Sequence, residues 1–166
     1  GAGLMIFVTV GTHEQPFDRL VEAVDGLLAD GALVEPVFVQ TGYCTYEPKR
    51  CEFSRFVSAP EMRSRMETAD VVVTHGGPSS FIEAMAAGKV PVVVPRRADL
   101  GEHVNNHQID FVRTVVERVG GIVPVFDVSE LPTAIERARS LSKDGGGFKS
   151  HNAEFCRDFE RLIERL

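Results

Sequence analysis

A glycine-rich turn lies in the middle of the chain, directly after the apolar run at residues 71–74. Gly76 and Gly77 lack side chains and therefore let a ligand approach the backbone closely. The proline that follows them is typical of a first helical turn, where free N–H groups and the positive end of the helix dipole suit a pyrophosphate. Ser79 and Ser80 add hydroxyl donors. We therefore predict that Gly76, Gly77, Ser79 and Ser80 contact a diphosphate.

Glu83 follows the two serines about one helical turn later. Its carboxylate could accept hydrogen bonds from both hydroxyls of a ribose, and we predict that role for it. The alternative is purely structural: a tight turn with a serine cap and a solvated glutamate. Two glycines, two serines and a following acid form a more specific set than a lone glycine motif, which favours the ligand-binding interpretation.

A second polar segment, residues 95–108, follows the next apolar run. The side chains that could contact sugar hydroxyls are those of Asn106, His107 and Gln108. Arg96 and Arg97 could add positive charge near a diphosphate, and such a pair would also suit a uronic acid. The alternative is an exposed loop followed by an asparagine-rich helix start.

A third turn with a glycine follows the first apolar run, at residues 9–17. Thr12 could contact a phosphate or an acceptor. His13 has an ordinary pKa near 6.5, so it could accept a proton, and it is the candidate catalytic residue. It could equally be a histidine of a surface loop.

Short apolar runs alternate with amphipathic stretches along the whole chain. The apolar runs predict strands at residues 6–10, 37–40, 52–57, 71–74, 90–94 and 122–126. Helices are predicted from residue 17 onward and at residues 60–68, 79–87, 104–118 and 129–140. Continuous apolar strands that alternate with helices indicate an α/β fold with a doubly wound, Rossmann-like parallel sheet. Ligands of such sheets bind at the carboxyl ends of the strands, where the three polar turns would meet.

Composition excludes several classes of protein. The chain has 166 residues and a net charge of −6, which argues against a nucleic-acid surface. No apolar run is long enough to span a bilayer, so the expected location is cytoplasmic. The 3 cysteines are too few for a disulfide framework. His103 and His107 could share a helix face but lack an obvious third ligand, so we predict no metal and no cofactor.

The expected organisation is a single donor-binding domain over residues 5–166. Residues 1–4 are interpreted as the remnant of a tag, with Met5 as the native start. A last amphipathic helix is predicted at residues 150–166, after a glycine-rich stretch. This helix could pack on its own sheet or dock a partner chain, and both interpretations stay open.

Three groups of residues together resemble the C-terminal domain of glycosyltransferase family 28. They are the first turn with Gly11, Thr12 and His13; the segment 75–80 with Glu83; and the segment 101–108, which ends in His107-Gln108. The resemblance runs from about Met5 to Val125. It is greatest to the small single-domain branch, which contains the catalytic subunit of the eukaryotic enzyme adding the second N-acetylglucosamine to the dolichol-linked precursor, and the small subunits of bacterial exopolysaccharide transferases.

The resemblance implies one half of a GT-B enzyme that holds a UDP-sugar donor. A separate membrane-associated subunit would supply the other half and the lipid-linked glycan acceptor, placing this chain at the inner face of the membrane. Sugar transfer would invert the anomeric carbon by direct displacement. Carried over to this chain, Glu83 contacts the ribose, the turn around Gly77 and Ser80 the diphosphate, and Gln108 the sugar; the uracil lies near residues 56–59.

The family resemblance leaves the role of His13 open, because the first turn departs from that of the peptidoglycan relative. The competing interpretation is a non-catalytic, nucleotide-sugar-binding regulatory subunit. A sugar-nucleotide epimerase would need both halves in one chain, and a flavodoxin-like domain would leave residues 102–108 without a purpose. The identity of the sugar stays open among glucose, galactose, glucuronic acid and N-acetylglucosamine.

Overall fold

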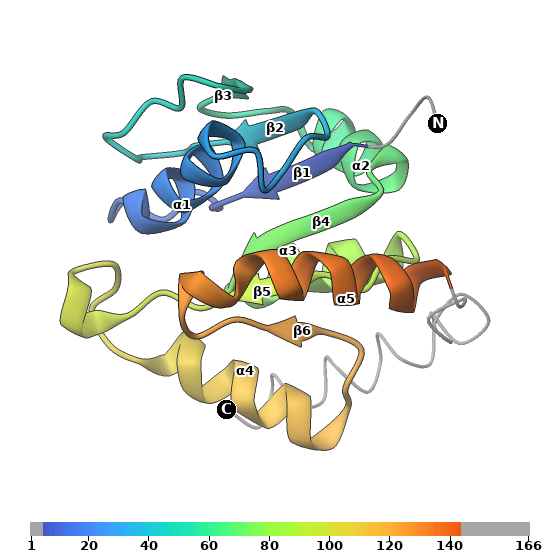
Figure 1. Ribbon diagram of the computed structural model, residues 1–166. Helices are drawn as coiled ribbons and strands as arrows, with labels where there is room; N and C mark the ends of the chain where they lie inside the picture. Colours follow the sequence, from blue (N-terminus) through green and yellow to red (C-terminus); the bar gives the residue numbers. More distant parts are fainter. Residues whose placement is uncertain (1–4, 144–166) are drawn as a thin grey trace.

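The fold is a single parallel sheet of six strands in the order β3-β2-β1-β4-β5-β6 (Figure 1). The computed structural model describes residues 5–143. The strands are β1 (Ile6–Thr9), β2 (Val37–Gln40), β3 (Glu52–Ser54), β4 (Val71–His75), β5 (Val92–Val94) and β6 (Val123–Pro124). All five pairings are parallel, so the carboxyl ends of the strands meet along one edge. The predicted doubly wound, Rossmann-like sheet is confirmed.

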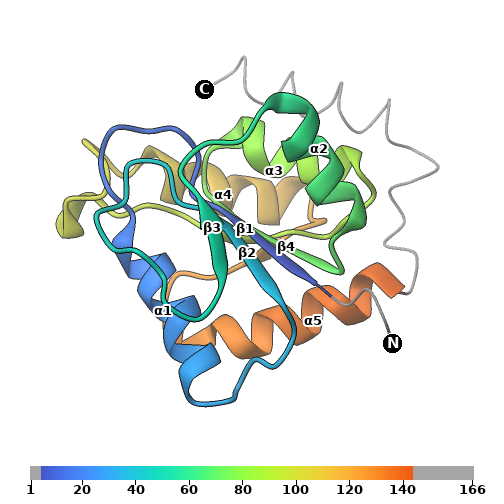
Figure 2. The same ribbon diagram turned by 90° about the horizontal axis from the view of Figure 1, so that it is seen from above.

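Helices cover both faces of this sheet (Figure 2). They are α1 (Asp18–Ala29), α2 (Ala59–Thr68), α3 (Pro78–Ala86), α4 (His107–Arg118) and α5 (Leu131–Lys143), with short 3-10 turns η1 (Ala98–Leu100) and η2 (Val128–Glu130). α1 and α5 pack on one face, and α2, α3 and α4 pack on the other. Successive strand residues point to opposite faces, and both faces are apolar cores, which is why the strands read as unbroken apolar runs.

Several element boundaries differ from the prediction. α4 begins at His107 rather than at residue 104, because Asn106 Oδ1 accepts a hydrogen bond from Ala98 N–H and holds the preceding segment in a loop. β3 and β6 are shorter than expected, as edge strands often are. Ser129 does not cap α5; Asp127 Oδ1 accepts from Ser129 N–H and starts the short turn η2 that precedes the helix.

Two carboxylates of α1 fix the loop between β2 and β3. Asp18 accepts hydrogen bonds from the N–H groups of Thr45 and Tyr46. Asp25, two turns later on the same face, accepts from the Tyr46 hydroxyl at 2.5 Å and from the N–H groups of Lys49 and Arg50. Burial alone would raise the pKa of Asp25, but these hydrogen bonds outweigh it and hold the pKa below its usual range. The loop beside the carboxyl edge is therefore anchored to α1.

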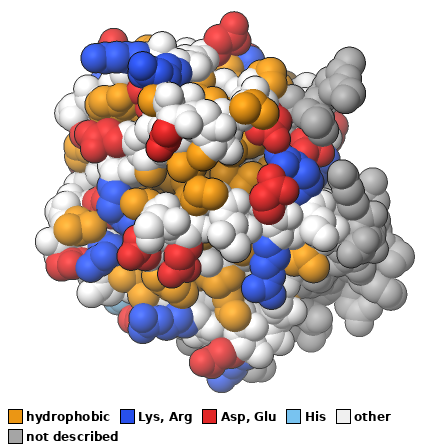
Figure 3. All heavy atoms as spheres, viewed as in Figure 1, with side chains coloured by type: hydrophobic (Ala, Val, Ile, Leu, Met, Phe, Trp, Pro, Cys, Tyr) orange, Lys and Arg blue, Asp and Glu red, His pale blue; other side chains and the backbone are white. Residues whose placement is uncertain are grey.

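On the face of the molecule drawn in Figure 3, the described residues carry acidic and basic side chains interspersed among apolar ones. Among residues 5–143, no helix is both long and apolar enough to cross a membrane. The predicted tag remnant at residues 1–4 and the predicted helix at residues 150–166 lie outside the described residues.

Replacing the buried carboxylate of Asp25 tests the anchoring of this loop. We expect Asp25→Ala to lower the free energy of unfolding by about 3 kcal/mol. The Tyr46 hydroxyl and the N–H groups of Lys49 and Arg50 would lose the charged acceptor that they share. Urea denaturation measures this, with the exposed neighbour Glu22→Ala as the matched control. A cost below about 1 kcal/mol would mean that the loop does not depend on this carboxylate.

Candidate functional site

The turns after β1, β2, β4 and β5 meet at the carboxyl edge of the sheet. Gly11 follows β1 in the left-handed region, with φ of +77°. Gly42 follows β2, and a Cβ there would lie 2.5 Å from the Gly11 carbonyl oxygen. Gly76 follows β4, and a Cβ there would lie 2.9 Å from Pro95 Cα and 3.1 Å from Gln108 Cβ. These glycines therefore let the turns pack directly against one another.

Gln40 at the end of β2 fixes the first of these turns. Its side-chain oxygen accepts hydrogen bonds from Thr9 Oγ1 at 2.5 Å and from Gly11 N–H at 3.2 Å. Its side-chain nitrogen donates to the carbonyls of Gly11 at 3.1 Å and Arg55 at 2.7 Å. Gln40 thus makes three hydrogen bonds with backbone groups and one with the Thr9 hydroxyl. These occupy the hydrogen-bonding capacity of its amide, so Gln40 has a structural role. A polar residue closing an apolar strand was the sequence signal for it.

His75 at the end of β4 is buried and neutral. Gly77 N–H donates to its Nδ1 at 3.1 Å, so the proton of the neutral ring is on Nε2, which then donates to Ser80 Oγ, also at 3.1 Å. Burial, followed by the charge of Arg96 and the neighbouring histidines His13 and His103, lowers the pKa of His75 to about 3. The Ser80 hydroxyl therefore accepts from His75 and keeps its own proton to donate elsewhere.

The His75 ring fits between two glycines. A Cβ on Gly11 would lie 2.3 Å from Nε2 of the ring, and a Cβ on Gly77 would lie 2.2 Å from Cε1. Both distances are far below van der Waals contact, so any side chain at either position displaces the imidazole. Sequence reasoning assigned Gly77 to ligand approach alone; packing of His75 is a second reason for a glycine there.

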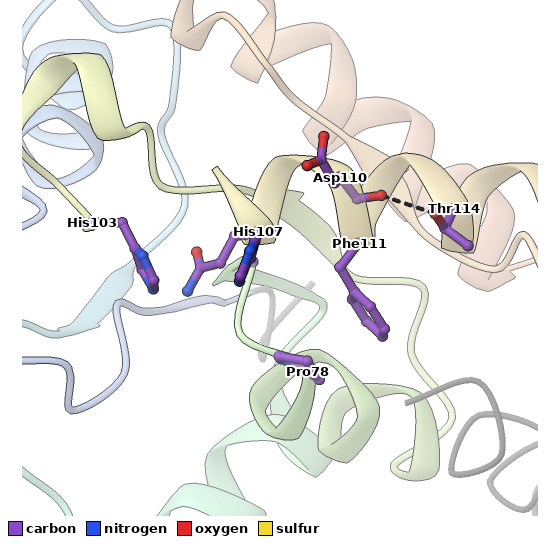
Figure 4. A pocket seen from close by; sticks show the side chains of 8 residues that line it. Pro78, His103, His107, Asp110, Phe111 and Thr114 are labelled. Atoms are coloured by element: carbon purple, nitrogen blue, oxygen red, sulfur yellow. Dashed lines mark hydrogen bonds between the residues drawn. The ribbon is translucent and has the colours of Figure 1, made fainter. Parts of the chain in front are cut away.

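A cavity of about 510 Å³ opens between the first turns of α3 and α4 (Figure 4). Six of the residues that line it are Gly76, Pro78, His103, His107, Gln108 and Phe111. It brings together three of the predicted site residues, Gly76, His107 and Gln108. The histidines at 103 and 107 come from the loop and from the start of α4, and both point into the cavity (Figure 4).

The other predicted site residues are not among those that line the cavity. Thr12 and Ser79 are exposed, and Glu83 is half-buried in α3. The Asn106 side-chain oxygen is occupied by Ala98 N–H at 3.0 Å, and Asn106 lines a separate hollow of about 340 Å³ beside Pro95.

Arg96 is the largest fully buried side chain among residues 5–143, with none of its surface exposed. Its guanidinium donates to three backbone carbonyls: those of Val10 at 2.8 Å, Gln15 at 2.5 Å and Glu102 at 3.1 Å. Within residues 5–143 it has no carboxylate at ion-pair distance. Arg96 therefore joins the turn after β1 to the loop after β5, a role that the sequence alone did not reveal.

The loop after β5 is held by further polar contacts. The buried carboxylate of Glu102 receives two hydrogen bonds from the Arg19 guanidinium, at 2.9 and 3.0 Å, and a third from Arg97 N–H at 3.0 Å. Arg97 pairs with Asp99 on the surface. Neither arginine of the predicted pair lines the cavity.

His13 and His103 face each other across the two loops, with ring centroids 4.6 Å apart. Each ring accepts a hydrogen bond at Nδ1 from the N–H two residues later, that of Gln15 or Asn105. Burial is the main cause that lowers the pKa of each, with Arg96 contributing to both. The neutral rings therefore carry their protons on Nε2.

Metal binding has no support from side-chain clustering. Among the described residues, no group of three or more His, Cys, Asp or Glu side chains could hold a metal ion. His103 lies in the loop before α4 rather than on the helix, so the predicted shared helix face with His107 does not form.

The sheet order and the helices on both faces define a Rossmann-like α/β domain. Several solved glycosyltransferase structures share this fold. The glycotransferase of kitacinnamycin has a TM-score of 0.66 and 21% identity, covering 99% of this chain and 43% of that one. SnogD from Streptomyces nogalater has a TM-score of 0.61 and 17% identity, covering 99% and 44%. The solution structure of ALG13 has a TM-score of 0.51 and 16% identity, covering 94% of each chain.

Residues 5–144 match the glycosyltransferase family 28 C-terminal domain, and the chain belongs to this family. A curated relative from Bdellovibrio bacteriovorus is 34% identical over 76 residues, which are 46% of this chain and 20% of the relative. That relative is a UDP-N-acetylglucosamine–N-acetylmuramyl-(pentapeptide) pyrophosphoryl-undecaprenol N-acetylglucosamine transferase. The aligned part is thus about a fifth of the relative's length.

Two glycine substitutions test the packing of His75. Gly77→Ala places a Cβ against the ring, so we expect it to lower the free energy of unfolding by about 2 kcal/mol or more. Gly26→Ala, on an exposed turn of α1 with no atom within 4 Å of the new Cβ, is the control. It should raise stability by about 0.5–1 kcal/mol. Equal effects in thermal or urea denaturation would contradict the packing role.

Protonation of His75 should couple stability to pH. Because its pKa is about 3 in the folded chain and about 6.5 when unfolded, the unfolded state binds the proton first as pH falls. Stability is therefore full above about pH 6.5 and decreases by about 1.4 kcal/mol per pH unit below it.

Denaturation between pH 6.5 and pH 5 measures this slope above the range in which the carboxylates titrate. His13 and His103 add to it in the same direction. His75→Asn retains an acceptor for Gly77 N–H but does not titrate, so we expect its slope to be smaller by about one proton. An unchanged slope would mean that His75 does not remain neutral on folding.

Proposed function

We propose that this chain is the donor-binding catalytic subunit of an inverting glycosyltransferase that transfers a sugar from a UDP-sugar to a lipid-linked acceptor in polysaccharide synthesis. The single observation that carries the proposal is the cavity between the N-termini of α3 and α4, at the carboxyl edge of a family 28 domain. The activity of the whole enzyme is part of the proposal, because the chain spans less than half the length of the larger glycosyltransferases that it matches.

The donor diphosphate is assigned to the first turn of α3. This helix starts with Pro78 and has no acidic residue in its first turn, so its positive end is not offset locally. The backbone of Gly76 and Gly77 forms the approach, and Ser79 is exposed beside it. The Ser80 hydroxyl, which accepts from His75, is left as a donor to a phosphate oxygen. Exposed Thr12 contributes from the turn opposite.

The ribose and the sugar are assigned to the two helices that flank this turn. Glu83 is the ribose ligand, on α3 one turn beyond the serines. His107 and Gln108 contact the sugar from the wall of the cavity. Arg96 N–H donates to Gln108 Oε1 at 3.0 Å and so orients this side chain, leaving its NH₂ to donate to a hydroxyl. Asn106 contributes its NH₂ from the adjoining loop.

Transfer by direct displacement develops negative charge on the departing UDP. Helix N–H groups and serine hydroxyls that are already oriented stabilise that charge without rearranging, which lowers the barrier. The attacking hydroxyl must also lose a proton. His13 could accept it only after Gln15 N–H releases Nδ1, because the neutral ring carries its proton on Nε2. We therefore assign the acceptor hydroxyl, and the group that orients it, to the complementary half of the enzyme.

The complementary half is proposed to be a membrane-associated partner subunit that binds the lipid-linked acceptor. Support comes from ALG13, a separate chain of matching extent with the same fold. The proposed location is accordingly cytoplasmic, peripheral at the inner face of the membrane through the partner. Exopolysaccharide synthesis is the proposed pathway, from the resemblance of the glycine-serine and His-Gln segments.

Titration calorimetry with UDP and UDP-sugars tests donor binding. Glu83→Ala should weaken UDP binding tenfold or more, since one charge-assisted contact contributes roughly 1.5–3 kcal/mol. Glu67→Ala, which removes an exposed carboxylate of α2, should leave the affinity unchanged. Absence of UDP binding, alone and with the co-expressed partner, would reject the proposal. Donor binding without sugar transfer in the presence of partner and acceptor would support the regulatory alternative instead.

A further inference from the structure

We propose that His103 takes up a proton when the diphosphate of the donor enters the cavity, and that the neutral ring of His13 supports the resulting cation. This inference rests on the proposed function, because the donor is the anion that it invokes. Donor binding thereby becomes linked to pH, a regulation of the site that the resemblance to family 28 does not imply.

The wall of the cavity carries no permanent positive charge. Among the described residues that line it there is no Lys or Arg, and the side chains that can gain a positive charge are those of His103 and His107. Both rings point into the cavity (Figure 4). Arg96 is fully buried, and its guanidinium donates to backbone carbonyls. A diphosphate therefore forms an ion pair with this wall only when a histidine is protonated.

The groups that face His103 keep its ring neutral in the absence of an anion. Burial is the main cause that lowers the pKa of His103, followed by the charges of His13, Arg96 and His107. Asp110 also lines the cavity, but its carboxylate points away from it (Figure 4). An entering diphosphate would supply the missing opposite charge and so raise the pKa of His103.

The ring of His13 lies against that of His103, with centroids 4.6 Å apart and planes tilted by 34°. A neutral aromatic ring attracts a cation that lies over its face within about 6 Å. Two charged rings at this distance would repel each other, so the pair accepts one proton rather than two. Glu14 favours a charge on His13, whereas burial and Arg96 oppose it more strongly.

The carboxylate nearest in sequence to His103 is already paired. Glu102 receives two hydrogen bonds from the Arg19 guanidinium and a third from Arg97 N–H. Its negative charge is therefore offset by Arg19 and does not hold a proton on the neighbouring ring.

The hydrogen bonds of the two loops favour His103 over His13 as the ring that gains the proton. A neutral ring with its proton on Nε2 becomes charged at Nδ1, which must first release the N–H group that it accepts. His103 Nδ1 accepts from Asn105 N–H at 3.3 Å, and His13 Nδ1 accepts from Gln15 N–H at 3.1 Å. The longer hydrogen bond is the weaker one, so His103 releases its partner at the lower cost. His103 also lines the cavity, and His13 does not.

Exposure favours His103 over His107. His107 is exposed at the start of α4, where water screens its charge from an anion. His103 is half-buried in the preceding loop, where the same charge interacts with an anion more strongly. The countercharge of the diphosphate is therefore assigned to His103.

Titration calorimetry in two buffers of different ionisation enthalpy measures the proton uptake. The ligand is whichever of UDP-glucose, UDP-galactose and UDP-N-acetylglucosamine binds most tightly, because a diphosphate esterified at both ends does not itself titrate near neutral pH. At pH 6.5 we expect uptake of about 0.3–1 proton per donor bound.

The dependence of donor affinity on pH follows from the same linkage. Because the pKa of His103 is higher with the donor bound than without it, the complex holds more protons than the free chain. Affinity therefore rises as pH falls between the two pKa values, by at most about tenfold per pH unit, and levels off above the higher one.

His103→Asn keeps an acceptor for Asn105 N–H but does not titrate. We expect this variant to lose most of the proton uptake and most of the pH dependence of donor affinity. His107→Asn removes the other histidine of the same wall and is the matched control, which should keep the proton uptake whatever it does to the affinity itself.

Nuclear magnetic resonance of the imidazole nitrogens tests the wild-type chain without any substitution. At pH 6.5 the His103 ring should change from the neutral to the protonated signal on addition of the donor, while the His13 and His75 rings remain neutral. A His103 ring that stays neutral in the complex overturns the inference.

The other outcomes separate this inference from the proposed function. Donor binding without proton uptake overturns the inference and leaves the proposed function intact. Uptake that persists in His103→Asn, or that disappears in His107→Asn, assigns the proton to another group and also overturns it. If neither UDP nor any UDP-sugar binds, alone and with the co-expressed partner, the proposed function is rejected, and the inference with it.

Discussion

The buried guanidinium of Arg96 joins the turn after β1 to the loop after β5, the two segments that form the sides of the crevice at the carboxyl edge of the sheet. It joins the carbonyls of Val10 and Gln15, in the turn after β1, to the carbonyl of Glu102, in the loop after β5. Transfer of a charge from water into a protein interior is costly unless polar partners replace the water. These carbonyls do so only when both loops lie where they are, so the requirement to solvate one cation fixes the shape of the crevice. The contact between His13 and His103 across the loops follows from it.

The same cation bears on how an acidic chain would bind the proposed anionic donor. The net charge is −6, yet Arg96 is a buried positive charge at the carboxyl edge of the sheet and the first turn of α3 has no acidic residue. Arg96 also opposes protonation of His75, after burial itself. A neutral His75 can accept from Gly77 and donate to Ser80, which a charged ring cannot do at both nitrogens. The electrostatics of the crevice thus come from buried groups, and surface composition does not reveal them.

The sheet was predictable from sequence because strands buried on both faces read as continuous apolar runs. That the segments at Gly76 and His107 would lie together was predictable, because parallel strands bring their carboxyl ends to one edge of the sheet. The start of α4 was placed three residues too early, since Asn106 bonds to a residue eight positions earlier, and no local pattern shows such a contact. The role of Arg96 was also missed because it depends on contacts between residues far apart in sequence. An arginine in a polar segment is expected to be exposed, and here the packing of two distant loops buries it.

The division of chemistry between this domain and its complement follows from the direction of its hydrogen bonds. Three side chains at the carboxyl edge of the sheet are left with a proton to donate. They are Ser80, whose hydroxyl oxygen accepts from His75, and His13 and His103, whose Nδ1 atoms accept from N–H groups of their own loops. Donors stabilise a leaving diphosphate, but they cannot remove a proton from an attacking hydroxyl. In the proposed enzyme, such a domain would favour departure of UDP and leave activation of the acceptor to the complementary half.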